Sequence, residues 1–181
     1  MSGVEFQQLM VEVMGYIAQK GWANFTIDGL SEYYGYDSSE IYGYFGHRQD
    51  VLLAVSRFAD CAVQRYHIQP DQPVRDKIFE LVMSRFDGLQ PLKDGLLSIT
   101  HSLPREPVSG VILTLCLPNS LLLLLKKAGL ATSGMKGIKN LACLSYVYLT
   151  SFRQWLKDEQ PDMGLTMAAL DRLIRKQHWL E

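Results

Sequence analysis

The stretch FTIDGLSEYYGYDSSEIYGYFGHRQDVLLAV, residues 25–55, decides the fold. A short apolar-patterned segment over residues 27–34 ends at a glycine, Gly35. Asp37 followed by Glu40 then matches a helix start, because a side-chain oxygen caps the helix and a carboxylate three residues later reaches back. The stretch therefore predicts two short helices joined by a tight turn, which is a helix-turn-helix.

Longer helices are expected on both sides of this pair, whose second helix is predicted over residues 38–45. Before it, apolar residues recur at three- and four-residue spacings over residues 4–20, and Gly21 stands where a helix C-terminus favours glycine. After it, helical periodicity resumes beyond Gly46 and continues to about residue 66. The N-terminal part of the chain is thus predicted to be a small bundle of helices.

The segment IQPDQP, residues 68–73, is the clearest linker, because its two prolines disfavour a helix interior. Beyond it, periodicity predicts helices over residues 74–90, 92–103, 107–128 with a bend at Pro118, 135–158 and 163–177. No alternating β pattern of useful length occurs, so the predicted fold class is all-α. The expected divisions are a helix-turn-helix domain over residues 1–48, a connecting helix over 49–67 and a C-terminal domain over 68–181.

The composition is that of a globular protein in a reducing compartment. The 181 residues are 48% apolar, which is ample for a buried core. The three cysteines, an odd number without a C-x-x-C pair, argue against disulfides and zinc and favour the cytoplasm. No secretory signal is readable, and the most apolar run, residues 111–125, is shorter than the ~20 residues that span a bilayer. We expect that run to form a buried core helix.

The charge of the chain is unevenly distributed. Residues 1–60 contain three Lys or Arg and eight Asp or Glu, whereas the rest of the chain is net basic. DNA affinity comes mostly from cations that neutralise phosphates, so an acidic helix-turn-helix lacks the sequence-independent part of that attraction.

Catalytic motifs are not found. The sequence has no G-x-S-x-G, no H-E-x-x-H, no phosphate-binding glycine loop and no cysteine with a base in its local sequence. We therefore expect a protein that is not an enzyme and has no cofactor and no metal site.

The block IYGYFGHRQDVLLAV, residues 41–55, together with the helices before it, resembles the N-terminal domain of TetR-family transcriptional repressors. The likeness covers about the first 60 residues and keeps the family's aromatic and Asp-x-Leu spacing. Two later segments, RFDGLQPLKDGL (85–96) and TMAALDRLIRK (166–176), resemble an alphaproteobacterial subgroup that is similar to the lipid-binding accessory proteins of ubiquinone biosynthesis. The resemblance implies an all-helical homodimer with an N-terminal three-helix helix-turn-helix domain and a C-terminal domain for ligand binding and dimerisation.

The resemblance also implies which residues would contact DNA. The helix over residues 38–45 would enter the major groove. The residues expected at DNA are Thr26, Ser38, Ser39, Glu40, Tyr42, Tyr44, His47 and Arg48. Four positions depart from the family: Asp28 and Ser38 replace residues that are commonly basic, Glu40 replaces a Thr or Ser, and Tyr34 replaces a small residue, usually alanine. Several tyrosines could equally belong to the domain core.

Two hypotheses of different classes follow. The first is a homodimeric TetR-like regulator that binds duplex DNA and is controlled by a small hydrophobic ligand. The second is a TetR-like protein without DNA binding that binds a lipid or quinone-like molecule, with peripheral contact to a membrane. A basic surface contributed by the dimer partner or by residues outside the helix-turn-helix domain would favour the first hypothesis, and an exposed apolar helix near residues 111–125 would favour the second.

Candidate ligand and dimer residues come from the C-terminal part. The family's cavity, expected between the helices that begin at residues 74, 107 and 135, would be lined by Phe79, Met83, Phe86, His101, Leu115, Leu122 and Tyr146. His101 would be its polar group, although an exposed histidine is the commoner arrangement. The apolar stripes of the last two helices are expected to form the dimer interface, with Leu141, Leu144, Tyr148, Phe152, Trp155, Met167, Leu170, Leu173 and Ile174 in contact with the partner.

Overall fold

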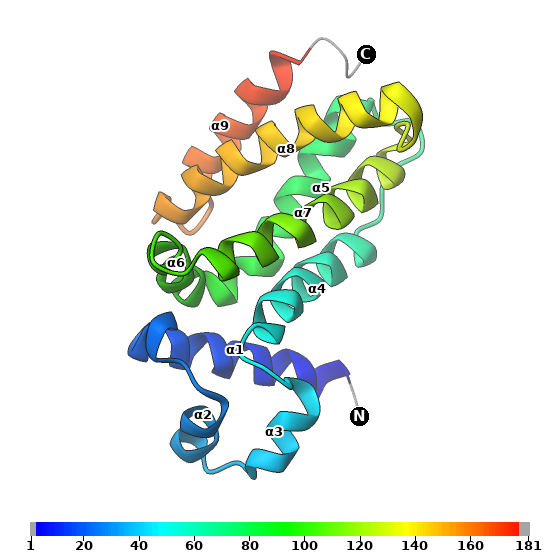
Figure 1. The fold of residues 1–181 in the computed structure, drawn as a ribbon. Helices are drawn as coiled ribbons and strands as arrows, with labels where there is room; N and C mark the ends of the chain where they lie inside the picture. The colour runs from blue at the N-terminus through cyan, green and yellow to red at the C-terminus, as the bar shows by residue number, and fades with distance from the viewer. Residues whose placement is uncertain (1–2, 178–181) are drawn as a thin grey trace. The chain divides into compact units, whose positions relative to one another are not determined.

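The computed structural model describes residues 3–177, which form helices and no strand (Figure 1). The predicted all-α fold class is therefore confirmed. The helices are α1 (Gly3–Lys20), η1 (Trp22–Asn24), α2 (Ile27–Tyr34), α3 (Ser38–Tyr44), α4 (Asp50–Arg65), α5 (Val74–Leu89), η2 (Gln90–Leu92), α6 (Lys93–Ser102), α7 (Pro107–Ala128), α8 (Gly134–Lys157) and α9 (Gly164–Arg175).

Local signals account for most helix boundaries. α2 and α7 have the predicted bounds, and α3 is one residue shorter than predicted. Gly35 adopts a left-handed conformation (φ 74°) at the end of α2, a geometry that favours glycine. α7 continues as one helix through Pro118.

The residues divide into two compact units that do not follow chain order. Unit 1 comprises the residues up to Phe58 together with Leu89–Cys116, and unit 2 comprises Ala59–Gly88 together with the residues from Leu117 onward. α6 and the first half of α7 thus belong with the helix-turn-helix, whereas the predicted boundaries followed the proline-containing linker. Each unit is described separately below.

In unit 1, α6 packs closely against α1. Gly95 of α6 is buried, and a Cβ added there would lie 2.6 Å from the carbonyl oxygen of Met14. Trp22 connects to α6 as well, since its backbone N–H donates to Ser98 Oγ at 3.0 Å. The helix-turn-helix is therefore anchored on a closely packed pair of helices.

We expect Gly95→Ala to lower the free energy of unfolding by about 1–3 kcal/mol, because the added methyl group meets backbone that cannot rotate away. Gly110→Ala in α7 is the matched control, since nothing lies within 4 Å of the Cβ it would add. Alanine there should stabilise the helix by about 0.5–1 kcal/mol. Urea unfolding of both variants measures the difference, and equal effects at the two sites would contradict the close α1–α6 packing.

Unit 2 has an aromatic core, and its helices α8 and α9 lie side by side (Figure 1). Phe86 of α5 stacks on Trp155 of α8, with ring centroids 5.6 Å apart and planes 7° apart. The turn between α8 and α9 is held by Asp158, whose buried carboxylate accepts hydrogen bonds from the backbone N–H and the hydroxyl of Thr166. These contacts fix the face that each helix turns toward its own subunit.

Among the described residues, α7 is the one helix that is long and apolar enough to cross a membrane, with 22 residues and an 18-residue window whose mean hydropathy is 2.1. It is longer than the apolar run within it, because the helix includes polar residues at both ends. Only 28% of the apolar window is buried, so the expectation of a buried core helix is wrong for much of α7. Length and composition of this kind also occur in core helices of soluble proteins and do not by themselves indicate a membrane protein.

Candidate nucleic-acid interface

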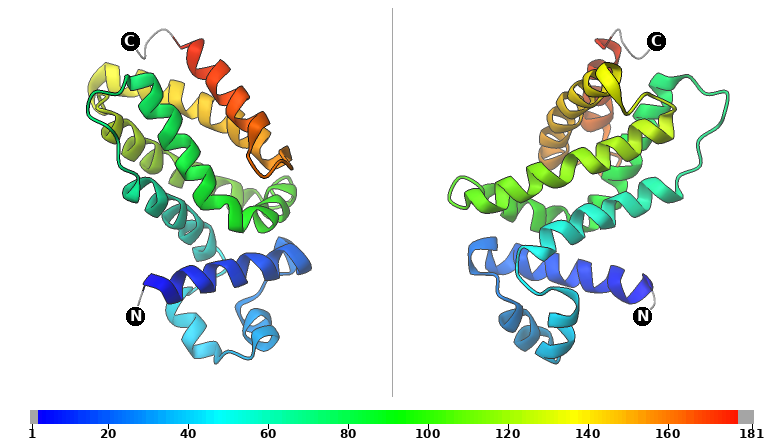
Figure 2. Two further views of the ribbon diagram at one scale, coloured as in Figure 1. Left: turned by 180° about the vertical axis from the view of Figure 1, so that it is seen from behind. Right: turned by 45° about the vertical axis from the view of Figure 1, so that its right-hand side comes forward.

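The turn between α2 and α3 has the geometry of a helix-turn-helix. Thr26 Oγ1 caps α2 by accepting from the Gly29 N–H at 3.0 Å. Asp37 caps α3 by accepting from the Ser39 N–H at 2.8 Å. Both views of Figure 2 place α2 and α3 on the same side of α1. The caps satisfy backbone donors that a short helix would otherwise leave unpaired.

The inner sides of α2 and α3 are anchored by apolar residues. Leu30 of α2, Ile41 of α3 and Phe45 after α3 are buried, each with at most 2% of its surface exposed. Trp22 and Phe25, which precede α2, stack with ring centroids 5.6 Å apart. The packing fixes the orientation of α3, so that its other face is presented to solvent.

The outer face of α3 carries several of the residues predicted to contact DNA. Ser39, Glu40 and Tyr42 are exposed, and Ser38 and Tyr44 are half-buried. Thr26 and His47 are also exposed, at the ends of the segment. The predicted residues of α3 thus share one accessible surface, although Tyr44 is partly covered by stacking on Phe6 with a centroid distance of 6.3 Å.

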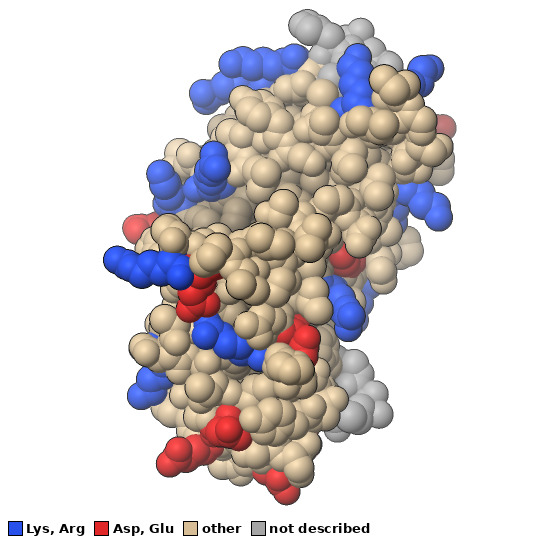
Figure 3. Space-filling view, viewed as in Figure 1, with Lys and Arg blue, Asp and Glu red and all other residues tan. Residues whose placement is uncertain are grey.

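This surface is acidic. Residues 25–47 contain Asp28, Glu32, Asp37 and Glu40 but no lysine and no arginine. On the face drawn in Figure 3, acidic side chains lie over the α2–α3 part of unit 1. A groove of about 340 Å³ between α1 and α3 adds to this charge, since Glu12 and Glu40 are among its lining residues. The arrangement repels phosphates, as the sequence predicts.

Several tyrosine hydroxyls of this region are bonded within the chain. Tyr42 donates to Asp28 Oδ2 at 3.2 Å, Tyr33 donates to Gln19 Oε1 at 2.8 Å, and Tyr34 donates to the Glu12 carbonyl oxygen at 3.2 Å. Each of these donors must leave its acceptor before it can bond a phosphate oxygen. The contact predicted for Tyr42 therefore requires the loss of an existing hydrogen bond.

Tyr36, which lines the same groove, donates a short hydrogen bond to the Glu12 carboxylate. That hydrogen bond, followed by burial and the negative charge of Glu12, raises the pKa of Tyr36 to about 12. Because this pKa is raised above the ordinary 10.0, the stability that the protonated phenol contributes is fully present below pH 10 and is lost as pH rises through about 12.

We expect Glu12→Gln to return the pKa of Tyr36 toward 10.0, since the main cause of the shift is removed. A pH titration of tyrosine ring carbons by NMR measures this change residue by residue. Tyr42, bonded to Asp28, is the internal control and should titrate as in the unmodified protein. An unchanged pKa at Tyr36 would contradict the role given to Glu12.

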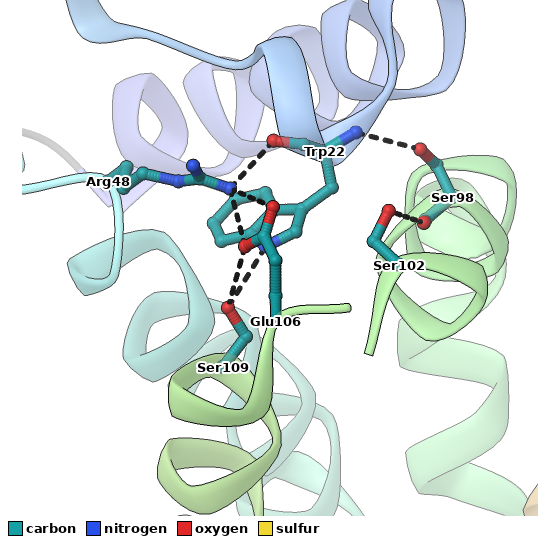
Figure 4. Close-up of polar contacts among 6 residues, drawn as sticks. All are labelled: Trp22, Arg48, Ser98, Ser102, Glu106 and Ser109. Atoms are coloured by element: carbon teal, nitrogen blue, oxygen red, sulfur yellow. Dashed lines mark hydrogen bonds and ion pairs between the residues drawn. The ribbon is translucent and has the colours of Figure 1, made fainter. Parts of the chain in front are cut away.

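The Arg48 side chain points toward Trp22 and Glu106 (Figure 4). Its Nη2 donates to the Trp22 carbonyl oxygen at 2.7 Å and to Glu106 Oε2 at 2.9 Å, and the guanidinium carbon lies 4.4 Å from the centre of the Trp22 ring. The phosphate contact predicted for Arg48 is therefore not available in this structure. Glu106 was not singled out in the sequence, because it lies 58 residues away from Arg48 and no local pattern joins them.

The network around Arg48 extends through Trp22. The indole Nε1–H of Trp22 donates to Ser109 Oγ at 3.0 Å, and the Ser109 hydroxyl donates to Glu106 Oε2 at 3.2 Å. Trp22, Arg48, Glu106 and Ser109 thus form a closed ring of polar contacts within unit 1 (Figure 4). The Trp22 ring contacts the Arg48 guanidinium on its face. Its indole N–H bonds to Ser109, the residue that orients the Glu106 carboxylate.

The structure separates the residues predicted to line a ligand cavity. His101 and Leu115 are exposed in unit 1, and Tyr146 is exposed on α8, so these three do not line an interior site. Met83 and Phe86 are buried in unit 2, where Phe79 and Leu122 are half-buried. Periodicity identified apolar positions but could not tell an interior position from an exposed one.

The stripe predicted to face a dimer partner packs inside the subunit. Its buried members are Leu144, Tyr148, Trp155, Leu170 and Ile174, and Leu141, Phe152, Met167 and Leu173 are half-buried. Tyr148 is held inward because its hydroxyl accepts from the buried Arg85 at 3.0 Å and its ring stacks on Phe86. The five buried residues are therefore core residues rather than interface residues, whereas the interface role of the four half-buried ones stays a prediction.

A second apolar stripe on α8 is exposed instead. Met135, Ile138, Tyr146 and Leu149 occur at helical spacing and are 44–82% exposed, and Leu165 of α9 is 50% exposed. An exposed apolar surface of this kind is characteristic of a protein interface. Among the described residues, no group of three or more His, Cys, Asp or Glu is placed to hold a metal ion.

Comparison with solved structures identifies the fold. The chain is similar to a TetR transcriptional regulator from Nitrosomonas europaea, with a TM-score of 0.77, 16% identity, and coverage of 96% of this chain and 98% of that one. A TetR transcriptional regulator from Rhodococcus sp. RHA1 gives a TM-score of 0.57 and 14% identity, with coverage of 97% of this chain and 96% of that one. A TetR-family transcriptional regulator from Streptomyces coelicolor gives a TM-score of 0.61 and 13% identity, with coverage of 96% of this chain and 80% of that one. No protein-family model and no curated protein matches the sequence. The chain thus has the fold of TetR-family regulators.

Proposed function

We propose that this chain is a homodimeric transcriptional regulator of the TetR type, which acts in the cytoplasm and binds duplex DNA through α3. The observation that carries the proposal is the capped helix-turn-helix with Ser39, Glu40 and Tyr42 exposed on the outer face of α3. A short helix presented in this way has the size and polarity that the major groove accepts. The fold shared with solved TetR regulators supports the same reading.

The acidic surface around α3 limits how much of the DNA affinity can come from phosphate contacts. Only Lys20 and Arg48 are basic among residues 1–50, and Arg48 is engaged by Glu106. Few phosphates are therefore neutralised, so affinity is modest and depends weakly on salt. Specific contacts then come from hydrogen bonds: Glu40 accepts from a cytosine amino group, and the serines at the start of α3 bond base edges.

Dimerisation and ligand binding are assigned to unit 2. The exposed stripe of α8 with Leu165 of α9 forms the dimer surface, in a four-helix contact with the partner's α8 and α9. A small hydrophobic ligand binds among the apolar residues of α5 and α7, beside Phe79, Met83 and Leu122. Mass spectrometry of small molecules that co-purify with the native protein tests this assignment and identifies the ligand.

Selection from a pool of randomised duplexes tests the proposed function. The protein, immobilised at low salt, should enrich a two-fold symmetric sequence over successive rounds, because a symmetric dimer presents two copies of α3. Ile41→Asp is the matched control, since it places a charge in the core beneath α3 and should abolish enrichment. A pool that remains random with the unmodified protein would contradict DNA recognition.

A second function is favoured by α7. Val108, Val111 and Leu115, spaced along the first half of this helix, are 55–68% exposed, and 28% of its apolar window is buried. These residues support a TetR-fold protein that touches a membrane and binds a lipid or quinone-like molecule, as in the ubiquinone-biosynthesis accessory type. Sedimentation with lipid vesicles tests it: binding that is lost in Val108→Asp/Val111→Asp, with no enrichment of any duplex, would replace the first function by the second.

A further inference from the structure

The cation closest in sequence to α3 is held by a carboxylate of the same unit. Arg48 follows α3 directly, and its Nη2 lies 2.9 Å from Glu106 Oε2 and 3.1 Å from Glu106 Oε1. Both oxygens of the carboxylate therefore bind one nitrogen of the guanidinium. A phosphate would use the same donor, because carboxylate and phosphate present equivalent acceptors to arginine.

We propose that Glu106 competes with the DNA backbone for Arg48 within the same subunit. This Arg48–Glu106 ion pair, here called the latch, keeps the DNA affinity of the protein low. The proposal rests on the proposed DNA-binding function and adds to it a regulated residue. In the latched state Arg48 supplies no phosphate contact. When Glu106 withdraws, the freed guanidinium lies beside the recognition helix and adds one contact per subunit.

The Arg48–Glu106 ion pair is open to competition from another anion. The Arg48 and Glu106 side chains are 28% and 23% exposed, so water and ions reach the pair and partly screen its attraction. Arg48 Nε is buried without a hydrogen-bond partner, which is a cost of the inward position that release removes. A polyanion at the surface of α3 therefore competes with a partly solvated ion pair and with the Trp22 carbonyl oxygen.

Hydrogen bonds nevertheless hold the Glu106 side chain and its backbone in place. Ser109, itself buried, donates to Glu106 Oε2 and accepts from the Trp22 indole N–H. The backbone N–H of Glu106 donates to the Ser102 carbonyl oxygen at 3.1 Å, at the end of α6. Glu106 is thus fixed by the turn between α6 and α7, and a change in that turn is sufficient to free Arg48.

The test compares the salt dependence of duplex binding for the unmodified protein and Glu106→Gln. Glutamine keeps the shape and the bond to Ser109 but removes the charge that holds Arg48. Each freed cation adds about 0.9 to the slope of log affinity against log salt, so a dimer gains about 1.8. At about 0.1 M salt this corresponds to roughly a 60-fold gain in affinity. Fluorescence anisotropy with one labelled duplex over a range of salt concentrations gives both quantities.

Three further variants assign the gain to Arg48. The double variant Glu106→Gln/Arg48→Gln should lose the added slope, because the freed cation is absent. Thr114→Ala, on the exposed side of α7, removes a hydroxyl that bonds neither Arg48 nor Glu106, and its slope should equal that of the unmodified protein. Glu106→Asp, which shortens the carboxylate by one methylene, should give a smaller gain in the same direction and serves if Glu106→Gln unfolds.

The outcomes separate the latch from the proposed function. A steeper slope in Glu106→Gln, or measurable binding by Glu106→Gln where the unmodified protein shows none, supports the latch. If the unmodified protein binds and Glu106→Gln has the same slope, the latch is overturned and the DNA-binding function stands. If neither protein binds at low salt, both are overturned, because freeing Arg48 then provides no anion contact.

Discussion

Ser38→Lys/Glu40→Thr should convert weak non-specific duplex binding into clearly measurable binding. The pair places a lysine at the first residue of α3 and removes an exposed carboxylate from the same turn. Two added lysines per dimer steepen the salt slope by about 1.8, equivalent to roughly 60-fold in affinity near 0.1 M salt. Loss of Glu40 repulsion adds to this gain. Anisotropy titrations with an arbitrary duplex measure it.

The control for this pair carries the same change of charge outside unit 1. Gln69→Lys/Asp71→Thr lies in the exposed linker after α4 and should leave duplex binding nearly unchanged. Circular dichroism checks that α3 survives, because Glu40 in its first turn favours the helix by about 0.3–1 kcal/mol. If the control pair raises affinity as much as the α3 pair, the surface of α3 is not where DNA binds.

Ile138→Asp/Leu149→Asp should dissociate the proposed dimer. Both side chains lie in the exposed stripe of α8. Each would be repeated on the partner in the proposed contact, so four charges would enter one apolar surface. Central apolar residues of an interface typically cost about 2 kcal/mol or more when lost, so the dimer should weaken by at least a factor of about 1,000. Sedimentation velocity at micromolar concentration should show a dimer for the unmodified protein and a monomer for the variant.

The matched control is Val108→Asp/Val111→Asp, which makes the same two changes on the exposed face of α7. It should remain a dimer and differ only in vesicle binding, if the second function applies. Unmodified protein that sediments as a monomer would contradict the dimer. A variant of the α8 stripe that stays dimeric would place the interface on another surface.

The helices could be predicted from the sequence because their ends depend on local chemistry. Thr26, Asp37 and Gly35 mark helix ends through bonds to neighbours a few residues away, and the structure has helices with those ends. The acidity of the α2–α3 segment is also a local property, since no cation occurs over residues 25–47. The character of the candidate interface was thus readable from one segment of the chain.

Which face of a helix is buried could not be predicted in the same way. α8 has two apolar stripes at helical spacing, and the buried one is selected by partners distant in sequence, such as Arg85 and Phe86 against Tyr148. The inward turn of Arg48 has the same origin, because Glu106 and Trp22 reach it only after α6 and α7 pack in unit 1. Residue roles that depend on such long-range pairs require the folded structure.

The most direct test of the central claim is the salt dependence of binding by the unmodified protein to its selected duplex and to a scrambled duplex. With Lys20 as the only other cation among residues 1–50, a dimer should show a slope of about −2, modest affinity near physiological salt and a clear preference for the selected sequence. A slope of about −6 or steeper with nanomolar affinity would show that phosphates are neutralised extensively. That result would contradict an interface of this charge.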